Sequence, residues 1–143
     1  MTDETDLRAR HLDTLQLIIS RLSQNSFTVR GWSITLVTAA FALLATQRLN
    51  STLVLFTLVP TWIFWGLDAS YMRTERLFRA LYTAATNRLN HPDAQPDIKP
   101  YDTDTTPFKH TTTSWLRLLL RPSVAAIPAI LTIMIITYAW INA

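Results

Sequence analysis

The side chains best placed to do chemistry are charged and hydroxyl groups at the ends of apolar stretches or inside them. Arg30 stands just before the apolar run of the first stretch, and Asp68 closes the second. A charged group in low-polarity surroundings is costly unless it is paired or hydrated, and two antiparallel helices would hold these residues at a similar height. We therefore predict an ion pair between Arg30 and Asp68. The alternative is that water solvates each charge independently.

Threonine hydroxyls form a second polar pattern. On a helix that turns 100° per residue, Thr57 and Thr61 share a side with Asp68. The first stretch also carries threonines on one side, at Thr28, Thr35, Thr38 and Thr46. Such hydroxyls could line a water-filled path, bond to a neighbouring helix or bond back to their own helix. We predict packing rather than a path for water, because threonine commonly joins apolar helices in this way.

Groups that catalyse reactions or hold cofactors are sparse. The chain has no cysteine and only two glycines, which leaves no thiolate metal site and no glycine-rich phosphate loop. The three histidines are scattered, at His11, His91 and His110. No spacing typical of a metal site or of an activated nucleophile occurs. We expect a protein that is not an enzyme and that carries neither cofactor nor metal.

Three apolar stretches must position these groups, and together they leave little room for a water-soluble core. Residues 122–141 include no charge and are long enough to cross about 30 Å of hydrocarbon as a helix. Residues 27–49 reach that length if the arginines at their two ends extend to opposite surfaces, and residues 51–69 do so with Pro60 inside. The sequence therefore predicts an all-α membrane protein with three transmembrane helices in a single membrane domain, 1–143.

The distribution of basic residues predicts orientation. Of 13 Lys and Arg residues, four lie up to Arg30 at the start of the first span, Arg48 alone lies at the end of that span, and eight lie from Arg73 to Arg121. Short loops rich in Lys and Arg stay in the cytoplasm. We expect a cytoplasmic N-terminus and an external C-terminus in a bacterial inner membrane. The net charge of +3 is explained by basic residues that set the membrane orientation and contact lipid headgroups, so no nucleic-acid partner is expected.

Two amphipathic helices are predicted outside the spans, at 6–24 and at 70–90, where the second continues the span before it. Their apolar stripes call for a partner, and we expect the stripes to pack antiparallel with each other or across subunits of a homo-oligomer. This candidate interaction face consists of Leu15, Ile18, Leu22, Phe78, Leu81 and Tyr82. Whether the chain bends between 6–24 and the first span, near Gly31, is left open.

The segment between the second amphipathic helix and the last span has two predicted parts. Residues 91–113 carry four prolines and many polar residues, which is typical of a linker without regular structure. Residues 114–121 combine four leucines and two arginines with a tryptophan and predict a short helix at the membrane surface.

Two stretches carry a resemblance to a known family: NSFTVRGWSITLV, at 25–37, and FWGLDASYMRTERLFRALY, at 64–82. They resemble elements of a family of small bacterial inner-membrane proteins, in which the first leads into one span and the second leads out of the next. The matching positions are Asn25, Ser26, Phe27, Arg30, Gly31, Trp32, Ser33, Trp65, Asp68, Tyr71, Glu75, Arg76, Phe78 and Tyr82. The resemblance covers roughly the first ninety residues and implies no established activity.

The function expected from these patterns is that of an oligomeric membrane anchor or interaction subunit, whose cytoplasmic helices bind a soluble partner. The alternative is a pore-forming or membrane-perturbing effector that uses the threonine and Asp68 stripes. Small proteins of several spans occur as membrane-disrupting effectors in antiphage systems, and this architectural analogy suggests the alternative.

Overall fold

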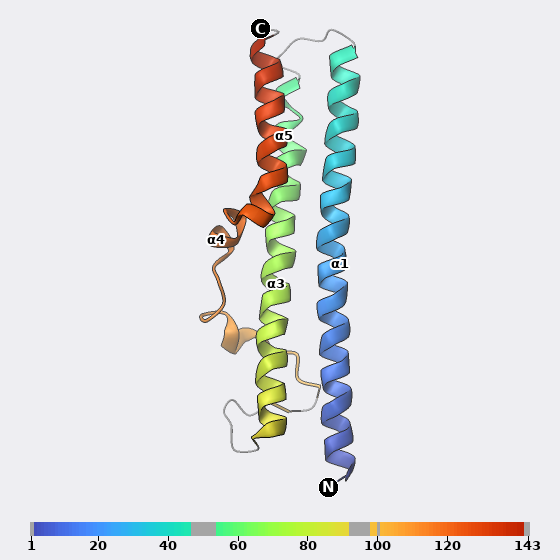
Figure 1. Ribbon diagram of the computed structural model, residues 1–143, viewed down its shortest axis with the longest axis vertical. Helices are drawn as coiled ribbons and strands as arrows, with labels where there is room; N and C mark the ends of the chain where they lie inside the picture. The colour runs from blue at the N-terminus through green and yellow to red at the C-terminus, as the bar shows by residue number, and fades with distance from the viewer. Residues whose placement is uncertain (1, 47–53, 92–97, 100, 142–143) are drawn as a thin grey trace. The chain divides into compact units, whose positions relative to one another are not determined.

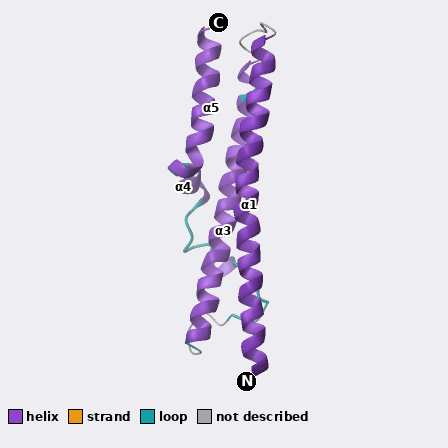
Figure 2. Ribbon diagram, turned by 45° about the vertical axis from the view of Figure 1, so that its right-hand side comes forward, coloured by secondary structure: helices purple, strands orange, loops and turns teal. Residues whose placement is uncertain are grey.

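The computed structural model describes residues 2–46, 54–91, 98–99 and 101–141. The described elements, in chain order, are α1, α3, the 3₁₀ helix η1, α4 and α5 (Figure 1). All regular structure in the described ranges is helical, and Figure 2 shows no strand among them. The prediction of an all-α chain is thus confirmed for this part of the protein.

Helix α1 runs without interruption over Thr2–Thr46, 45 residues in all. It includes the predicted amphipathic helix 6–24 and most of the predicted span 27–49. The sequence left open whether the chain bends between them, and in the structure the helix is continuous there. Gly31 lies in its middle, is exposed, and has nothing within 4 Å of where a Cβ would stand. A glycine in a helix costs about 1 kcal/mol relative to alanine, which is too little to stop a helix of this length. Residues 47–49 lie outside the described ranges.

Helix α3 extends over Leu58–Asn90 and begins later than the sequence predicts. The sequence predicts a helix at 51–69 that continues to 90 with Pro60 inside; among its described residues, 54–55 are helical and 56–57 form a turn that interrupts it. That turn is closed by hydrogen bonds from Thr57 N–H to the Val54 carbonyl, 3.1 Å, and from Val59 N–H to the Phe56 carbonyl, 3.2 Å. Pro60 explains the break, since a proline clashes with the carbonyl four residues before it but is tolerated in the first turn of a helix. Residues 51–53 lie outside the described part.

The remaining elements follow the predicted boundaries closely. The predicted linker holds one 3₁₀ turn, η1, at Thr106–Phe108. Helix α4, Trp115–Leu119, falls inside the predicted surface helix 114–121. Helix α5, Pro122–Ile141, coincides with the predicted last span. A proline at the first helical position suits a helix start, because the N–H it lacks would have no partner there.

The chain divides into two compact units. We call Met1–Gln24 with Tyr71–Ser114 the polar unit, and Asn25–Ser70 with Trp115–Ala143 the apolar unit. Helices α1 and α3 each contribute residues to both.

The core of the polar unit is made by the two predicted amphipathic stripes and by one linker residue. Leu15 of α1 and Leu81 of α3 are 0% and 1% exposed, and Ile98 of the linker packs with them. Phe78 and Tyr82 cover this cluster, and the side-chain amide of Gln16 donates a hydrogen bond to the Tyr82 hydroxyl at 2.8 Å. The stripes therefore pack on each other within one chain, the first of the two predicted arrangements. The two other members of the candidate interaction face, Ile18 and Leu22, are half-buried.

The core of the apolar unit joins α1 and α5 with the residues that precede α3. Val37, Val54, Leu131 and Ile135 form the buried cluster. Phe41 of α1 and Tyr138 of α5 also pack edge to face, with ring centroids 4.9 Å apart. Around this narrow core most large apolar side chains are exposed, as in Phe27, Trp32, Leu43, Ile130, Ile133 and Trp140.

Two helices of the described part are long and apolar enough to cross a membrane, judged by length and composition: the stretch Thr5–Leu43 of α1, and α5. Of the qualifying apolar sequence, 17% is buried in α1 and 28% in α5. Helix α3 does not qualify within the described residues, because its apolar part from Leu58 reaches Asp68 after only about two and a half turns.

Candidate functional site

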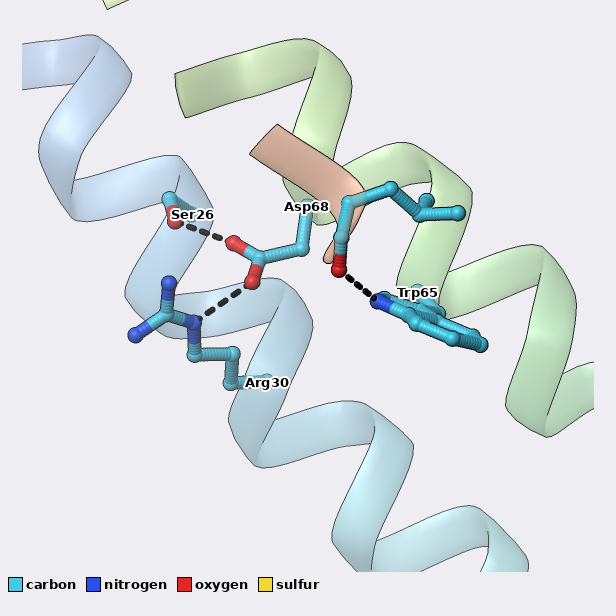
Figure 3. A network of polar contacts seen from close by, with 5 residues as sticks. Ser26, Arg30, Trp65 and Asp68 are labelled. Atoms are coloured by element: carbon cyan, nitrogen blue, oxygen red, sulfur yellow. Dashed lines mark hydrogen bonds and ion pairs between the residues drawn. The ribbon is translucent and has the colours of Figure 1, made fainter. Parts of the chain in front are cut away.

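The most constrained polar group of the apolar unit is the Asp68 carboxylate on α3. Asp68 is 3% exposed, and a buried carboxylate is costly unless hydrogen bonds and an opposite charge replace its water. Its Oδ2 accepts a hydrogen bond from Arg30 Nε at 2.7 Å, and its Oδ1 accepts one from the Ser26 hydroxyl. Figure 3 shows both donors of α1 directed at the carboxylate. The structure thus brings together the two residues that the sequence predicts as a pair and adds a third.

Helix geometry explains why one carboxylate receives both donors. Ser26 and Arg30 are four residues apart, so their side chains emerge on the same side of α1, one turn apart. Asp68 faces them near the end of the apolar part of α3. We call Ser26, Arg30 and Asp68 the polar clamp. Each carboxylate oxygen of Asp68 has a donor, so the clamp holds a compensated ion pair.

Arg30 differs from its partner in exposure. Its side chain is 28% exposed, whereas that of Asp68 is 4% exposed. The Nη2 atom of Arg30 is buried and has no hydrogen-bond partner among the residues described. Part of the arginine side chain is therefore open to solvent, whereas the aspartate depends almost wholly on the protein.

A small cavity adjoins the clamp. It is lined by Arg30, Ser33, Phe64, Trp65, Asp68, Val124, Ile127 and Pro128. Its size suits about one water molecule rather than an organic substrate. Its lining surface is almost wholly apolar, so the cavity offers a water few hydrogen-bond partners. The lining offers no space for a reaction on a second molecule.

Two tryptophans fasten α4 to the turn of α3 that also carries Asp68. Trp65 Nε1 donates to the Leu119 carbonyl at 3.0 Å, also drawn in Figure 3, and Trp115 Nε1 donates to the Ser70 hydroxyl at 3.2 Å. The Trp115 ring also lies over Gly66, where a Cβ would meet it at 3.6 Å. The clamp and α4 are therefore held by the same six residues of α3, 65–70.

The predicted threonine stripes separate into two environments. Thr57 and Thr61 are buried, and their hydroxyls donate to carbonyls of preceding residues, Val54 at 2.6 Å and Thr57 at 2.9 Å. The four threonines of α1 are exposed: Thr28, Thr35, Thr38 and Thr46. The Thr46 hydroxyl donates to the carbonyls of Ala42, at 3.1 Å, and Leu43, at 2.9 Å. The hydroxyls of Thr57 and Thr61, on the side of Asp68, therefore donate their hydrogen bonds to backbone carbonyls of the same chain.

Another polar contact that the sequence did not predict lies in the polar unit. His11 of α1 is 3% exposed, and its Nδ1 accepts a hydrogen bond from the Tyr101 N–H at 3.0 Å. Its Nε2 is buried without a partner among the described residues. Tyr101 adopts φ 64°, a left-handed conformation that is uncommon outside glycine. Burial lowers the pKa of the His11 imidazole, and the nearby Asp102 charge opposes that shift.

Ser26, Trp65 and Trp115 were also missed as site residues. Ser26 and Trp65 do lie in the two stretches that carry the family resemblance, and those stretches supply all three members of the clamp. Trp115 and Ser70 are 45 residues apart, and no sequence pattern links them.

Elsewhere the described residues offer no alternative site. No group of three or more His, Cys, Asp or Glu side chains that could hold a metal ion occurs among them. Glu75 and Arg79 form an ion pair one turn apart at 2.7 Å, with the Arg79 side chain 62% and the Glu75 side chain 13% exposed, so this is a pair along the helix surface whose carboxylate is half-buried. No protein-family model, curated protein or solved structure matches the chain.

Proposed function

We propose that the chain is an integral protein of the bacterial inner membrane that works by anchoring and interaction rather than by catalysis. The observation that carries this proposal is the exposure of α5. This helix has 20 residues and no charge, yet Ile133 is 65% and Trp140 81% exposed. A water-soluble protein would bury such a helix, whereas exposed apolar side chains along its length suit lipid.

Three spans fit the proposal best. Helix α1 is more than twice as long as a span needs, about 20 residues, and Arg8, Arg10, Asp13 and Arg21 all lie in its first half. We therefore assign 27–49 to the membrane and 2–24 to water. The second span, 51–69, combines the start of α3 with the residues before it, and α5 is the third. The basic segment from Arg73 to Arg121 then faces the cytoplasm, as does the N-terminus.

The polar clamp supports an anchoring role over a transport role. A proton relay or a cation site needs a carboxylate oxygen that a proton or ion can reach, but both oxygens of Asp68 already accept hydrogen bonds. The hydroxyls of Thr57 and Thr61 are likewise engaged by backbone carbonyls. In this proposal the clamp fixes α1 against α3 within the apolar unit.

The soluble partner and the second copy of the chain would meet other surfaces than the predicted stripe. Leu15 and Leu81 are already covered by their own chain. A cytoplasmic partner is therefore expected on the charged outer faces of the polar unit, which carry the surface pairs Asp6–Arg10 and Glu75–Arg79.

Membrane extraction tests the proposal. The tagged full chain should remain in the membrane pellet after an alkaline carbonate wash. Ile133→Asp should reduce the inserted amount, because a central aspartate opposes insertion by about 3 kcal/mol. Leu17→Asp is the matched control: Leu17 is 54% exposed in the polar unit, and this variant should insert normally. Release of the unmodified chain into the supernatant would contradict the proposal.

A membrane-perturbing effector is the second candidate, and the exposed threonine side of α1 favours it. Thr35 and Thr38 are exposed on the same helix as Gly31, whose Cα faces open space. Copies of the chain that met along this side would bring several hydroxyls together around one axis. Overexpression should then arrest growth and admit a membrane-impermeant dye, and Thr35→Val with Thr38→Val should abolish dye entry. Normal growth without dye entry would remove this candidate.

A further inference from the structure

A surface on α4 and the turn after it combines two leucines with two arginines. Leu116 and Leu120 are 65% and 72% exposed, and Arg117 and Arg121 are exposed beside them. The hydrogen bond from Leu120 N–H to the Leu116 carbonyl, 3.3 Å, carries the helical turn past the end of α4. Residues four apart share a side of such a turn, so the leucines form one row and the arginines the next. We call these four residues the headgroup surface.

The headgroup surface is held rigidly from behind. Leu118, on another side of the same turn, is 0% exposed. The indole N–H groups of Trp65 and Trp115 tie α4 to α3 at 3.0 Å and 3.2 Å. A ligand that binds here therefore meets a preformed surface and does not have to order a loose segment.

The two guanidinium groups have no anionic partner in the described part of the chain. No ion pair or side-chain hydrogen bond of Arg117 or Arg121 occurs there, whereas Arg10, Arg30 and Arg79 each pair with a carboxylate. Exposed leucines directly beside arginines that have no carboxylate partner among the described residues match the boundary of an anionic bilayer. At that boundary the leucines enter the acyl region, and each arginine donates two parallel hydrogen bonds to a lipid phosphate.

We propose that the headgroup surface binds the anionic phospholipid headgroups of the leaflet that α5 enters. The charge complementarity of the arginines and the direct continuation of this surface into α5, which begins at Pro122, identify lipid as the occupant. The inference rests on the proposed membrane insertion and goes further, because it names the charge class of the lipid and the residues that recognise it.

Binding of a short-chain phosphatidylglycerol to the detergent-purified full chain tests the inference. A short-chain phosphatidylcholine and inorganic phosphate serve as reference ligands. Arg117→Gln with Arg121→Gln should weaken phosphatidylglycerol binding about thirtyfold, since each basic residue near an anionic surface contributes about fivefold. Phosphatidylcholine and phosphate should bind weakly to both proteins. Arg10→Gln with Arg21→Gln, two exposed arginines of the polar unit, is the matched control and should bind as the unmodified chain does.

Three results would overturn the inference. Equal binding of the two lipids would show no selection for charge. Equal weakening by the control pair would show attraction by net charge rather than by this surface. Binding of inorganic phosphate without binding of phosphatidylglycerol would point to a free anion as the ligand. The carbonate wash distinguishes failure of this inference from failure of the proposed membrane insertion, because an inserted chain without a lipid preference would still stay in the membrane pellet.

Discussion

Removing the two charges of the polar clamp one at a time should have unequal effects. Replacing Arg30 strands a carboxylate that is 4% exposed, with only the Ser26 hydroxyl left to solvate it. Replacing Asp68 leaves an unpaired arginine whose side chain is 28% exposed. The structure therefore predicts that the loss of the arginine destabilises the protein more than the loss of the aspartate.

The magnitudes follow from burial. Arg30→Gln should lower the free energy of unfolding by about 3–5 kcal/mol, the usual cost of a buried charge without its partner. Asp68→Asn should cost about 1–3 kcal/mol, since the remaining group can hydrate. Ser26→Ala should cost about 1.5–3 kcal/mol, the value of a hydrogen bond to a charged group. The double change of Arg30 and Asp68 should cost about 1–3 kcal/mol less than the two single changes added together.

The assay is unfolding of the full chain in detergent micelles by a denaturant titration, for the two single variants and the double variant. The exposed pair Asp6–Arg10 provides the control double-mutant cycle, in which the coupling energy should stay below about 0.5 kcal/mol. An exchange of the two residues, Arg30→Asp with Asp68→Arg, should recover part of the loss. Strictly additive losses would refute the coupling, and a larger loss for Asp68→Asn than for Arg30→Gln would refute the argument from burial.

Three further predictions follow from single contacts. His11 should make the polar unit acid-sensitive: its folded pKa lies below the ordinary 6.5, so the unfolded chain binds more protons and stability falls as pH drops through about 6.5. His11→Gln should flatten the thermal stability of the full chain between pH 7.5 and 5.5, and an unchanged slope would contradict this role. Leu81→Asp should lower the membrane-inserted level by placing a charge in a site that is 1% exposed, and unchanged abundance on a blot would count against the packed core. Thr61→Val should change the free energy of unfolding in detergent by less than about 1 kcal/mol, because the Thr61 hydroxyl donates to the Thr57 carbonyl four residues earlier in the chain. A large loss would mean that Thr61 has a partner in another helix.

The sequence predicts those elements whose boundaries are fixed by strong local signals. Helix α5 begins at a proline and contains no charge, so its limits follow from composition. The linker is evident from its prolines. The continuity of α1 could not be predicted, because the penalty at Gly31 is small beside the stability of a 45-residue helix. The start of α3 could have been predicted, because Pro60 has no N–H to donate to the carbonyl four residues before it, as an earlier helix start would require.

The site shows the same division between local and non-local information. The Arg30–Asp68 pair follows from two charges in apolar surroundings. The contribution of Ser26 depends on how α1 is rotated toward α3 within the apolar unit, which helical periodicity alone does not determine. The bonds of Trp65 and Trp115 join segments 54 and 45 residues apart and depend on the path of the chain between them.

The number and direction of the membrane crossings are the centre of the account, and single-cysteine labelling tests them most directly. The chain has no cysteine, so one introduced thiol reports on its own position. In spheroplasts, a membrane-impermeant maleimide should label Asn50→Cys and Asn142→Cys at once and Thr103→Cys only after permeabilisation. Labelling of Thr103→Cys in intact spheroplasts would contradict the three-span arrangement with a cytoplasmic N-terminus, because a chain that crosses only through α1 and α5 would carry that residue outside.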